Sequence, residues 1–194
     1  MKKFSFVLLI LLNSLSITCS KEGSDLKARL ESLSGKYSDP KPYIYGKAFG
    51  KRVFTFDKGK WTLVFTLALD PEMKKQVFDF RTYGNFIIQD KSNIPNTYKA
   101  LFIEDKKFIT LKTENKDLIQ AFGFMDCNLE IGIEKDISEK GCSLWRPISE
   151  CASDYDLLSL DDSGKLYFGE RPQDNNMCTE DKRPTKLTPA VVLE

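Results

Sequence analysis

The sequence predicts a mainly β protein: an antiparallel β-barrel or half-barrel with one short helix in the interior of the chain and a disulfide-stapled C-terminal cap. Three observations predict this fold. Short segments with apolar residues at alternate positions recur between residues 43 and 111. Turn-forming residues separate these segments at short intervals. The four cysteines beyond the N-terminal leader all fall in the last third of the chain: Cys127, Cys142, Cys151 and Cys178.

The composition limits the classes of function. A chain of 194 residues is long enough for one domain with one substantial core. It has 29 lysines and arginines against 28 acidic residues, so it offers no large basic field for a nucleic-acid backbone. It contains no histidine, which excludes histidine-based nucleophile systems and histidine-ligated zinc. We therefore expect no nucleic-acid partner, no cofactor, no metal site and no enzymatic activity.

Residues 1–18 have the layout of an export signal of the lipoprotein type. Two lysines precede an apolar stretch, residues 4–12, that is too short to span a bilayer. Cys19 follows directly, as in the lipobox of bacterial lipoproteins, although the residues before it depart from the usual pattern. We expect lipidation at Cys19, which would anchor an exported protein to a membrane of the bacterial cell envelope. Ordinary cleavage nearby, with Cys19 incidental, is the alternative.

Residues 19–34 are expected to form a tether and a short helix ahead of a single β-barrel-like domain, residues 35–194. Residues 20–23 are polar or glycine, which is typical of a tether. A helix over residues 25–33 places three leucines on one face: Leu26, Leu30 and Leu33. This stripe favours packing against the barrel, and a helix lying on a membrane surface is the alternative.

From residue 43 onward, apolar and polar residues alternate with a period of two, which predicts strands. Short strands over residues 43–49 and 53–56 are expected to meet at Gly50 and Lys51. A turn at 57–60 then leads into the clearest strand, residues 60–69. That strand places its large apolar side chains on one face: Trp61, Leu63, Phe65, Leu67 and Leu69.

The alternation resumes after a turn at residues 70–72. Strands are expected over 76–83 and 84–88, followed by a polar loop at 90–96. Residues 97–103 and 108–112 are expected to form a hairpin across the charged turn 104–107.

The last third contains a helix, a hairpin and a final strand. Asn115 is the predicted N-cap of a helix over residues 115–122, and Gly123 is its predicted stop. Strands at 155–160 and 165–168 are expected to form a hairpin, and residues 186–193 to return to the sheet.

One face of the predicted sheet is rich in aromatic side chains: Trp61, Phe65, Phe78, Phe80, Tyr98 and Phe102. In a barrel too wide to be filled by its own side chains, such a face lines an apolar ligand pocket. In a narrower barrel the same residues are ordinary core, and periodicity alone favours the core.

The four late cysteines allow three pairings. We favour Cys127–Cys142 and Cys151–Cys178, because each closes a local loop with little regular structure. A metal site is the rival interpretation, but it lacks any CxxC pair and any histidine. The cysteines therefore predict disulfide bonds and no metal.

The charged clusters of the last third have ordinary explanations. Paired acids can hydrolyse glycosides when they are held a few ångströms apart. Two pairs of aspartates lie close together in the sequence here: Asp154/Asp156 and Asp161/Asp162. The second pair falls in a predicted turn, where acids are favoured by the backbone. Arg171 and Lys182-Arg183 precede prolines and favour a solvated loop, with contact to a lipid headgroup as the alternative.

Several ordered blocks resemble a known family. In the last third these blocks are Cys127, Ile131-Gly132, Asp136-Ile137, Gly141-Cys142, Tyr155-Asp156, Gly164, residues 169–174 and residues 182–185. Upstream, a weaker similarity continues at Asp70-Pro71, Gly84 and Thr97. The series covers most of residues 35–192 and resembles the adenomatosis polyposis coli down-regulated family domain.

The resemblance implies a lipid-binding antiparallel barrel with an apolar pocket, which brings the pocket interpretation of the aromatic face level with the core. Animal members restrain Wnt signalling and carry two domain copies with a C-terminal membrane span. This chain has one copy and an N-terminal lipid signal, so that role does not transfer. Family cysteines near residues 38–41 and at Met73 are missing, as expected from loss of one disulfide.

The expected function is therefore that of a non-enzymatic, lipid-anchored envelope protein that binds a lipid or acyl chain on the aromatic face. The alternative is a surface module with a filled core that binds another protein, through the polar loop 90–96 and the charged segment 170–185.

Overall fold

The computed structural model describes residues 18–194. The export signal expected over residues 1–18 lies outside this range except for its last residue. Helix α1 (Thr18–Glu31) precedes the sheet and α2 (Lys116–Ala121) follows β6, with short 3-10 turns η1 (Met125–Cys127) and η2 (Glu180–Lys182). The strands are β1 (Gly35–Ser38), β2 (Tyr43–Tyr45), β3 (Ala48–Asp57), β4 (Lys60–Ala68), β5 (Gln76–Lys91), β6 (Thr97–Leu111), β7 (Glu134–Asp136), β8 (Ser153–Leu160), β9 (Leu166–Phe168) and β10 (Val192–Leu193).

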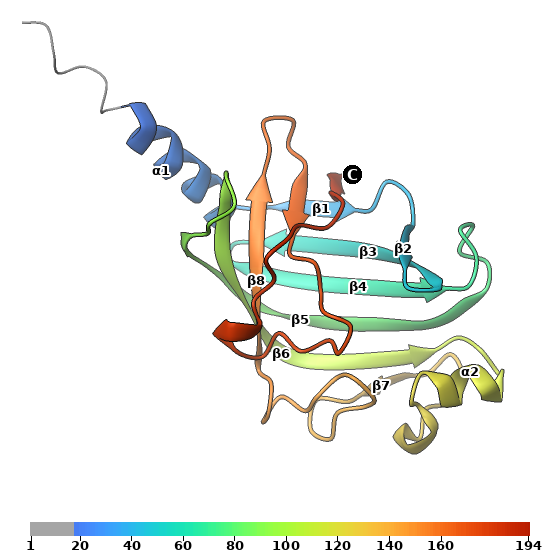
Figure 1. The fold of residues 1–194 in the computed structure, drawn as a ribbon. Coiled ribbons are helices and arrows are strands. Elements are labelled where there is room, and N and C mark those ends of the chain that lie inside the picture. The colour runs from blue at the N-terminus through green and yellow to red at the C-terminus, as the bar shows by residue number, and fades with distance from the viewer. Residues whose placement is uncertain (1–17) are drawn as a thin grey trace, which may run out of the picture.

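The strands form one antiparallel sheet in the order β10-β1-β3-β4-β5-β6-β8-β9, with β2 beside β3 and β7 beside β6. The sheet curls so strongly that β8 crosses the direction of β3, β4 and β5 steeply (Figure 1). Isolated bridges Leu166↔Val191 and Gly169↔Leu187 join β9 to the chain that leads into β10. Because β10 pairs with β1, these bridges nearly close the barrel, as the sequence predicts.

The hairpin between β3 and β4 follows from its turn residues. Lys58 and Gly59 both have positive φ, at 49° and 80°, which is the geometry of a two-residue hairpin turn. On β4 the side chains of Trp61, Leu63, Phe65 and Leu67 are buried. Leu69, expected on the same face, lies beyond the end of the strand and is 41% exposed.

Three predicted breaks in the strands are wrong: at residues 50–51, at residues 104–107, and between residues 83 and 84. The expected junction at Gly50 and Lys51 lies inside β3, and the turn is at residues 46–47 instead. Gly50 is required for another reason: a Cβ there would lie 2.7 Å from the ring of Phe65.

The second wrong break is the hairpin expected across residues 104–107. β6 runs without interruption through these residues, and β5 likewise continues through Gly84. Gly84 pairs with Glu104 and Tyr83 with Lys106, so Asp105 is an extra residue that forms a bulge in β6. The bulge resets the alternation, and both Glu104 and Lys107 point into the barrel. A Cβ at Gly84 would lie 2.0 Å from the Ile103 carbonyl oxygen, which explains the glycine there.

The N-terminal helix packs against the barrel through its last turn. Leu30 and the following Leu33 are fully or nearly buried in the core, as the favoured interpretation predicts. The tether expected at residues 20–23 is wrong, because α1 already begins at Thr18. Lysine and glutamate are good helix formers, and they extend the helix across the single glycine of that stretch.

Two irregular segments complete the molecule. The cap segment, residues 122–151, contains η1 and β7 and is closed by Cys127–Cys142. The closing segment, residues 170–193, carries Cys178, which is bonded to Cys151. The predicted disulfide pairing is confirmed, and each crosslink typically contributes about 2–4 kcal/mol. The cap segment follows α2, which lies at the far end of the molecule from α1 (Figure 1).

The other elements of the last third are largely as predicted. The Asn115 side chain accepts hydrogen bonds from the backbone N–H groups of Asp117 and Leu118 and caps α2. The hairpin of β8 and β9 is present. The last strand is shorter than the expected residues 186–193, because Pro189 has no N–H to donate and only β10 pairs as a strand.

Candidate functional site

The six aromatic residues of the predicted pocket are all buried, with exposed fractions of 2–9%: Trp61, Phe65, Phe78, Phe80, Tyr98 and Phe102. They come from β4, β5 and β6. The structure divides them into two groups that have different surroundings, one around Trp61 and Phe102 and one around Phe78 and Phe80.

The first group is part of a filled core. The rings of Trp61 and Phe102 lie 4.8 Å apart, and Phe102 also contacts Phe86 and Phe168. Phe168 in turn stacks on Phe54 at 4.0 Å. The aromatic side chains of β3, β4, β5, β6 and β9 therefore fill this half of the barrel themselves.

The second group is covered by the cap segment. The ring of Trp145 stacks on Phe80 at 4.9 Å and meets Phe78 edge-on at 5.4 Å. Phe122 and Phe124 also pack on Phe78, at 5.6 and 5.2 Å. This half of the aromatic face is thus closed by rings from irregular chain. We did not anticipate Trp145, although its place between Cys142 and Cys151 was a usable signal.

Beside Phe80 the barrel contains a buried ion pair that the predicted turn at 104–107 concealed. Lys107 Nζ lies 2.7 Å from Glu104 Oε2, and the two side chains are 3% and 4% exposed. Lys107 Nζ also donates to the carbonyl oxygens of Cys151 and Arg146, at 2.9 and 3.2 Å. The spacing of three residues, unusual for two inward residues of one strand, results from the bulge.

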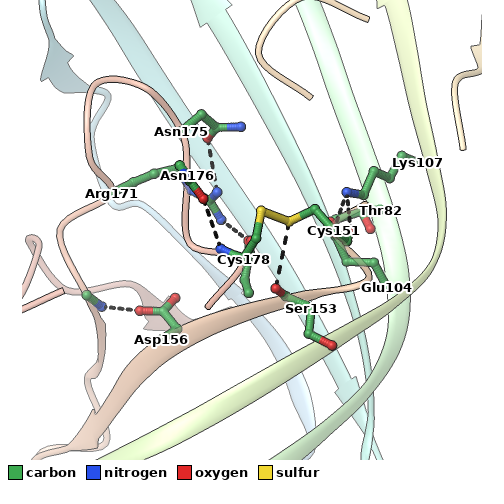
Figure 2. A network of polar contacts seen from close by, with 12 residues as sticks. Thr82, Glu104, Lys107, Cys151, Ser153, Asp156, Arg171, Asn175, Asn176 and Cys178 are labelled. Carbon is green, nitrogen blue, oxygen red and sulfur yellow. Dashed lines mark hydrogen bonds and ion pairs between the residues drawn. A yellow bond between two sulfur atoms is a disulfide. The ribbon is translucent and has the colours of Figure 1, made fainter. Parts of the chain in front are cut away.

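A second ion pair joins β8 to the closing segment. Arg171 Nη2 donates to Asp154 Oδ2, and Arg171 Nη1 donates to Asn175 Oδ1 at 3.0 Å. Figure 2 shows the Cys151–Cys178 disulfide between Arg171 on one side and the Glu104–Lys107 pair on the other. Arg171 is therefore neither in a solvated loop nor free for a headgroup outside the barrel.

Arg183 is also engaged internally. Its Nη1 donates to the carbonyl oxygens of Ala100 and Asp156, and its Nη2 donates to Gln89 Oε1 at 2.7 Å. Only 7% of its side chain is exposed, so the solvated-loop interpretation is wrong for this arginine as well. Arg183 thus binds the closing segment to β5, β6 and β8.

The buried carboxyls have altered acidity. Burial first and the Asp154 carboxylate second raise the pKa of Glu104 to about 7, against the opposing effects of Lys107 and Arg171. Burial also raises the pKa of Asp156 to about 6, against the opposing charge of Arg171. Asp156 Oδ1 accepts from the N–H groups of Leu157 and Gly169, at 2.7 and 2.9 Å. The barrel interior therefore holds carboxyls that exchange protons near neutral pH.

A small cavity lies where the aromatic and the ionic groups meet. Its volume is about 20 Å³, room for one water-sized group. Its lining carries three basic and two acidic side chains, with apolar walls from the β5 strand and the cap segment: Phe80, Glu104, Lys107, Leu144, Trp145, Arg146, Cys151, Asp154, Arg171, Asn175 and Cys178. Among the six predicted pocket residues, Phe80 lines this cavity.

A larger and more open cleft, of about 380 Å³, lies on the cap segment. It is bounded by β7 and the region of the Cys127–Cys142 disulfide, and its lining is mostly polar: Asp126, Cys127, Asn128, Lys135, Asp136, Ile137, Glu139, Lys140 and Gly141. Nearby in sequence, four large apolar side chains are 49–59% exposed: Met125, Ile131, Ile133 and Leu144.

Two further residues that the sequence singles out, Asp161 and Cys19, lie in a turn and in helix α1. Asp161 binds the backbone and side chain of its own turn, through Ser163 and Lys165, as the turn interpretation predicts. Cys19 lies in the first turn of α1. Among residues 25–194, no group of three or more cysteine, aspartate or glutamate residues is placed to hold a metal ion. Over the same range no helix has the length and hydropathy of a membrane span.

The chain matches no protein-family model, and a search of curated proteins finds no match.

Proposed function

We propose that this protein is a non-enzymatic, lipid-anchored envelope protein that binds an amphiphile with an acyl chain between the aromatic face and the cap segment. The observation that carries the proposal is the way in which Phe78 and Phe80 are covered. Their partners Phe122, Phe124 and Trp145 come from irregular chain, and Trp145 is only half-buried. A cover of this kind can move without breaking the sheet.

Simple energetics favour exchange of the Trp145 ring for an acyl chain. Each methylene moved from water to an apolar site contributes about 0.8 kcal/mol, so ten methylenes contribute about 8 kcal/mol. Exposing one large aromatic side chain costs roughly 3 kcal/mol. The remaining 5 kcal/mol or so exceeds an association cost of about 4 kcal/mol by about 1 kcal/mol, so the affinity should rise with each further methylene of the acyl chain.

The proposed location has separate support. Two disulfides are typical of an oxidising compartment outside the cytosol. The leader and Cys19 have the layout of a lipoprotein signal. The resemblance to the lipid-binding family domain supports the ligand class. Two arginines within the blocks that carry this resemblance, Arg171 and Arg183, hold the closing segment to the barrel in this chain.

Replacing Phe80 by aspartate tests the proposal. Phe80→Asp places a charge beneath Trp145, so uptake of a fluorescent fatty acid should fall at least tenfold. Ile87→Asp is the matched control, because Ile87 lies on the same strand and is 49% exposed. Both variants are checked by circular dichroism. Unchanged uptake by a folded Phe80→Asp protein would contradict the proposed site.

A second candidate function is binding of another protein through the cap segment. It is favoured by the four exposed apolar side chains at residues 125–144, since clustered exposed apolar residues mark interaction surfaces. Its test is capture of a partner by the wild-type protein and by the variant Ile131→Ser/Ile133→Ser. Equal capture by both would count against the cap segment as the interface.

A further inference from the structure

The lining of the small cavity carries more basic than acidic side chains. Lys107, Arg146 and Arg171 line it together with Glu104 and Asp154, which leaves one positive charge in excess when all five are ionised. Arg146 is exposed at the rim, the Arg171 side chain is 30% exposed, and Lys107 is 3% exposed. The cations therefore extend from the surface to the buried end of the cavity.

The apolar walls of the same cavity belong to the proposed acyl site. Phe80 and Trp145, which stack on each other, both line the cavity. Leu144, beside Trp145, is 50% exposed at the rim. A molecule with its charged end at Lys107 would therefore extend its apolar part along Phe80, where the Trp145 ring now lies.

We propose that this cavity is the headgroup site of the ligand, and that the ligand is an amphiphile with a single carboxylate, held by Lys107 and Arg171 and bound together with one proton on Glu104. This inference rests on the proposed function and specifies its ligand class.

The size and charge of the cavity favour one carboxylate over larger anions. About 20 Å³ admits one or two oxygen atoms, whereas a phosphate ester brings three acceptor oxygens and more charge. With Glu104 protonated, the lining carries two excess positive charges; one of them is on the exposed Arg146, and a monoanion neutralises the other. The apolar walls exclude small hydrophilic acids as good ligands, because such acids leave Phe80 and Trp145 without a contact.

The need for a proton on Glu104 follows from the number of hydrogen-bond donors that Lys107 has. Its ammonium group has three N–H donors, and these already serve Glu104, Cys151 and Arg146. A ligand carboxylate can take the place of Glu104 only if Glu104 gives up its charge. A second anion beside Glu104 and Asp154 otherwise adds repulsion in a buried site.

The charged groups that face Glu104 come from four elements. They are Lys107 on β6, Asp154 on β8, Arg171 in the closing segment and Arg146, which lines the same cavity, in the cap segment. Burial and Asp154 hold the pKa of Glu104 at about 7 in the free protein, so a proton is available there at neutral pH. Above that pH, binding must take a proton from solvent, and affinity should fall about tenfold per pH unit.

The test is equilibrium dialysis of the full chain against radiolabelled palmitate and radiolabelled hexadecanol, which differ only in their headgroups. At pH 6 we expect palmitate to bind at least tenfold more tightly, with this preference declining above pH 7. Equal binding of the two would overturn the headgroup site and leave the proposed function standing. Binding of neither would overturn both.

Three variants locate the effect. Lys107→Met should abolish the preference for palmitate while hexadecanol still binds, which also shows that the barrel is folded. Glu104→Gln should bind palmitate with no pH dependence between pH 6 and 8. Lys106→Gln is the matched control, because Lys106 is the next residue but pairs with Asp136 on the outside at 2.8 Å. A pH dependence that persists in Glu104→Gln would overturn the proposed proton site.

Discussion

Replacing Arg52 by methionine should lower the free energy of unfolding by about 3–5 kcal/mol. Arg52 and Asp39 form a deeply buried ion pair, with side chains 8% and 2% exposed. Arg52 Nη2 lies 2.6 Å from Asp39 Oδ1, and its guanidinium also donates to Thr188 Oγ1 and Pro189 O at 2.7 and 2.8 Å. Methionine fills the space but leaves the Asp39 carboxylate buried without its cation.

Urea unfolding measures this effect, and two further variants interpret it. Arg81→Met removes an ion pair with Glu134 on the outer surface and should cost no more than about 1 kcal/mol. Adding Asp39→Leu to Arg52→Met should recover much of the loss, because it removes the uncompensated charge. The part that is not recovered reports the bonds that Arg52 makes to the closing segment. Equal costs for Arg52→Met and Arg81→Met would contradict this account of barrel closure.

The free energy of unfolding should fall as the pH rises from about 4.5 to about 7. Glu104 has a pKa of about 7 in the folded protein against an ordinary value of 4.5, and Asp156 has a pKa of about 6 against an ordinary value of 3.8. Between these values the folded state binds more protons than the unfolded state, so raising the pH favours unfolding. For Glu104 alone the expected loss is on the order of 3 kcal/mol.

Carboxyls on the surface act in the opposite direction at lower pH. Hydrogen bonds hold the pKa of Asp136, Asp161 and Glu180 at about 2, so their contribution is lost as the pH falls below about 4. Stability should therefore be greatest near pH 4–5. Urea unfolding between pH 3 and 8 measures the curve, with Glu104→Gln expected to flatten its decline and Asp105→Asn, a change at the exposed bulge residue, to leave it unaltered. A steady rise in stability from pH 5 to 8 would contradict the buried position of Glu104.

The parts of the fold that the sequence predicts are those that local interactions determine. The turn at Lys58-Gly59 and the cap at Asn115 depend on residues within a few positions of each other. The disulfide pairing was also predictable, because each pair closes a short loop with sequence separations of 15 and 27 residues.

The candidate site was not predictable in the same way. Glu104 and Lys107 have the composition of a turn, and they become interior residues only because the bulge at Asp105 opposes Gly84 on another strand. The bonds that Arg171 and Arg183 make to β8 join residues 17 and 27 positions apart, which no local pattern reveals. The six aromatic residues predicted to share one face are all buried, but the division of that face between a filled core and the half beneath Trp145 depends on how the cap segment returns.

The proposed binding of an amphiphile is tested most directly by native mass spectrometry of the wild-type chain, residues 20–194, produced in an oxidising compartment and purified without detergent. We expect a discrete added mass that fragments as a fatty acid, or the same mass after incubation with palmitate. A mass that stays that of the protein alone after incubation with palmitate and mixed lipids would contradict the proposal and leave protein binding through the cap segment as the better account.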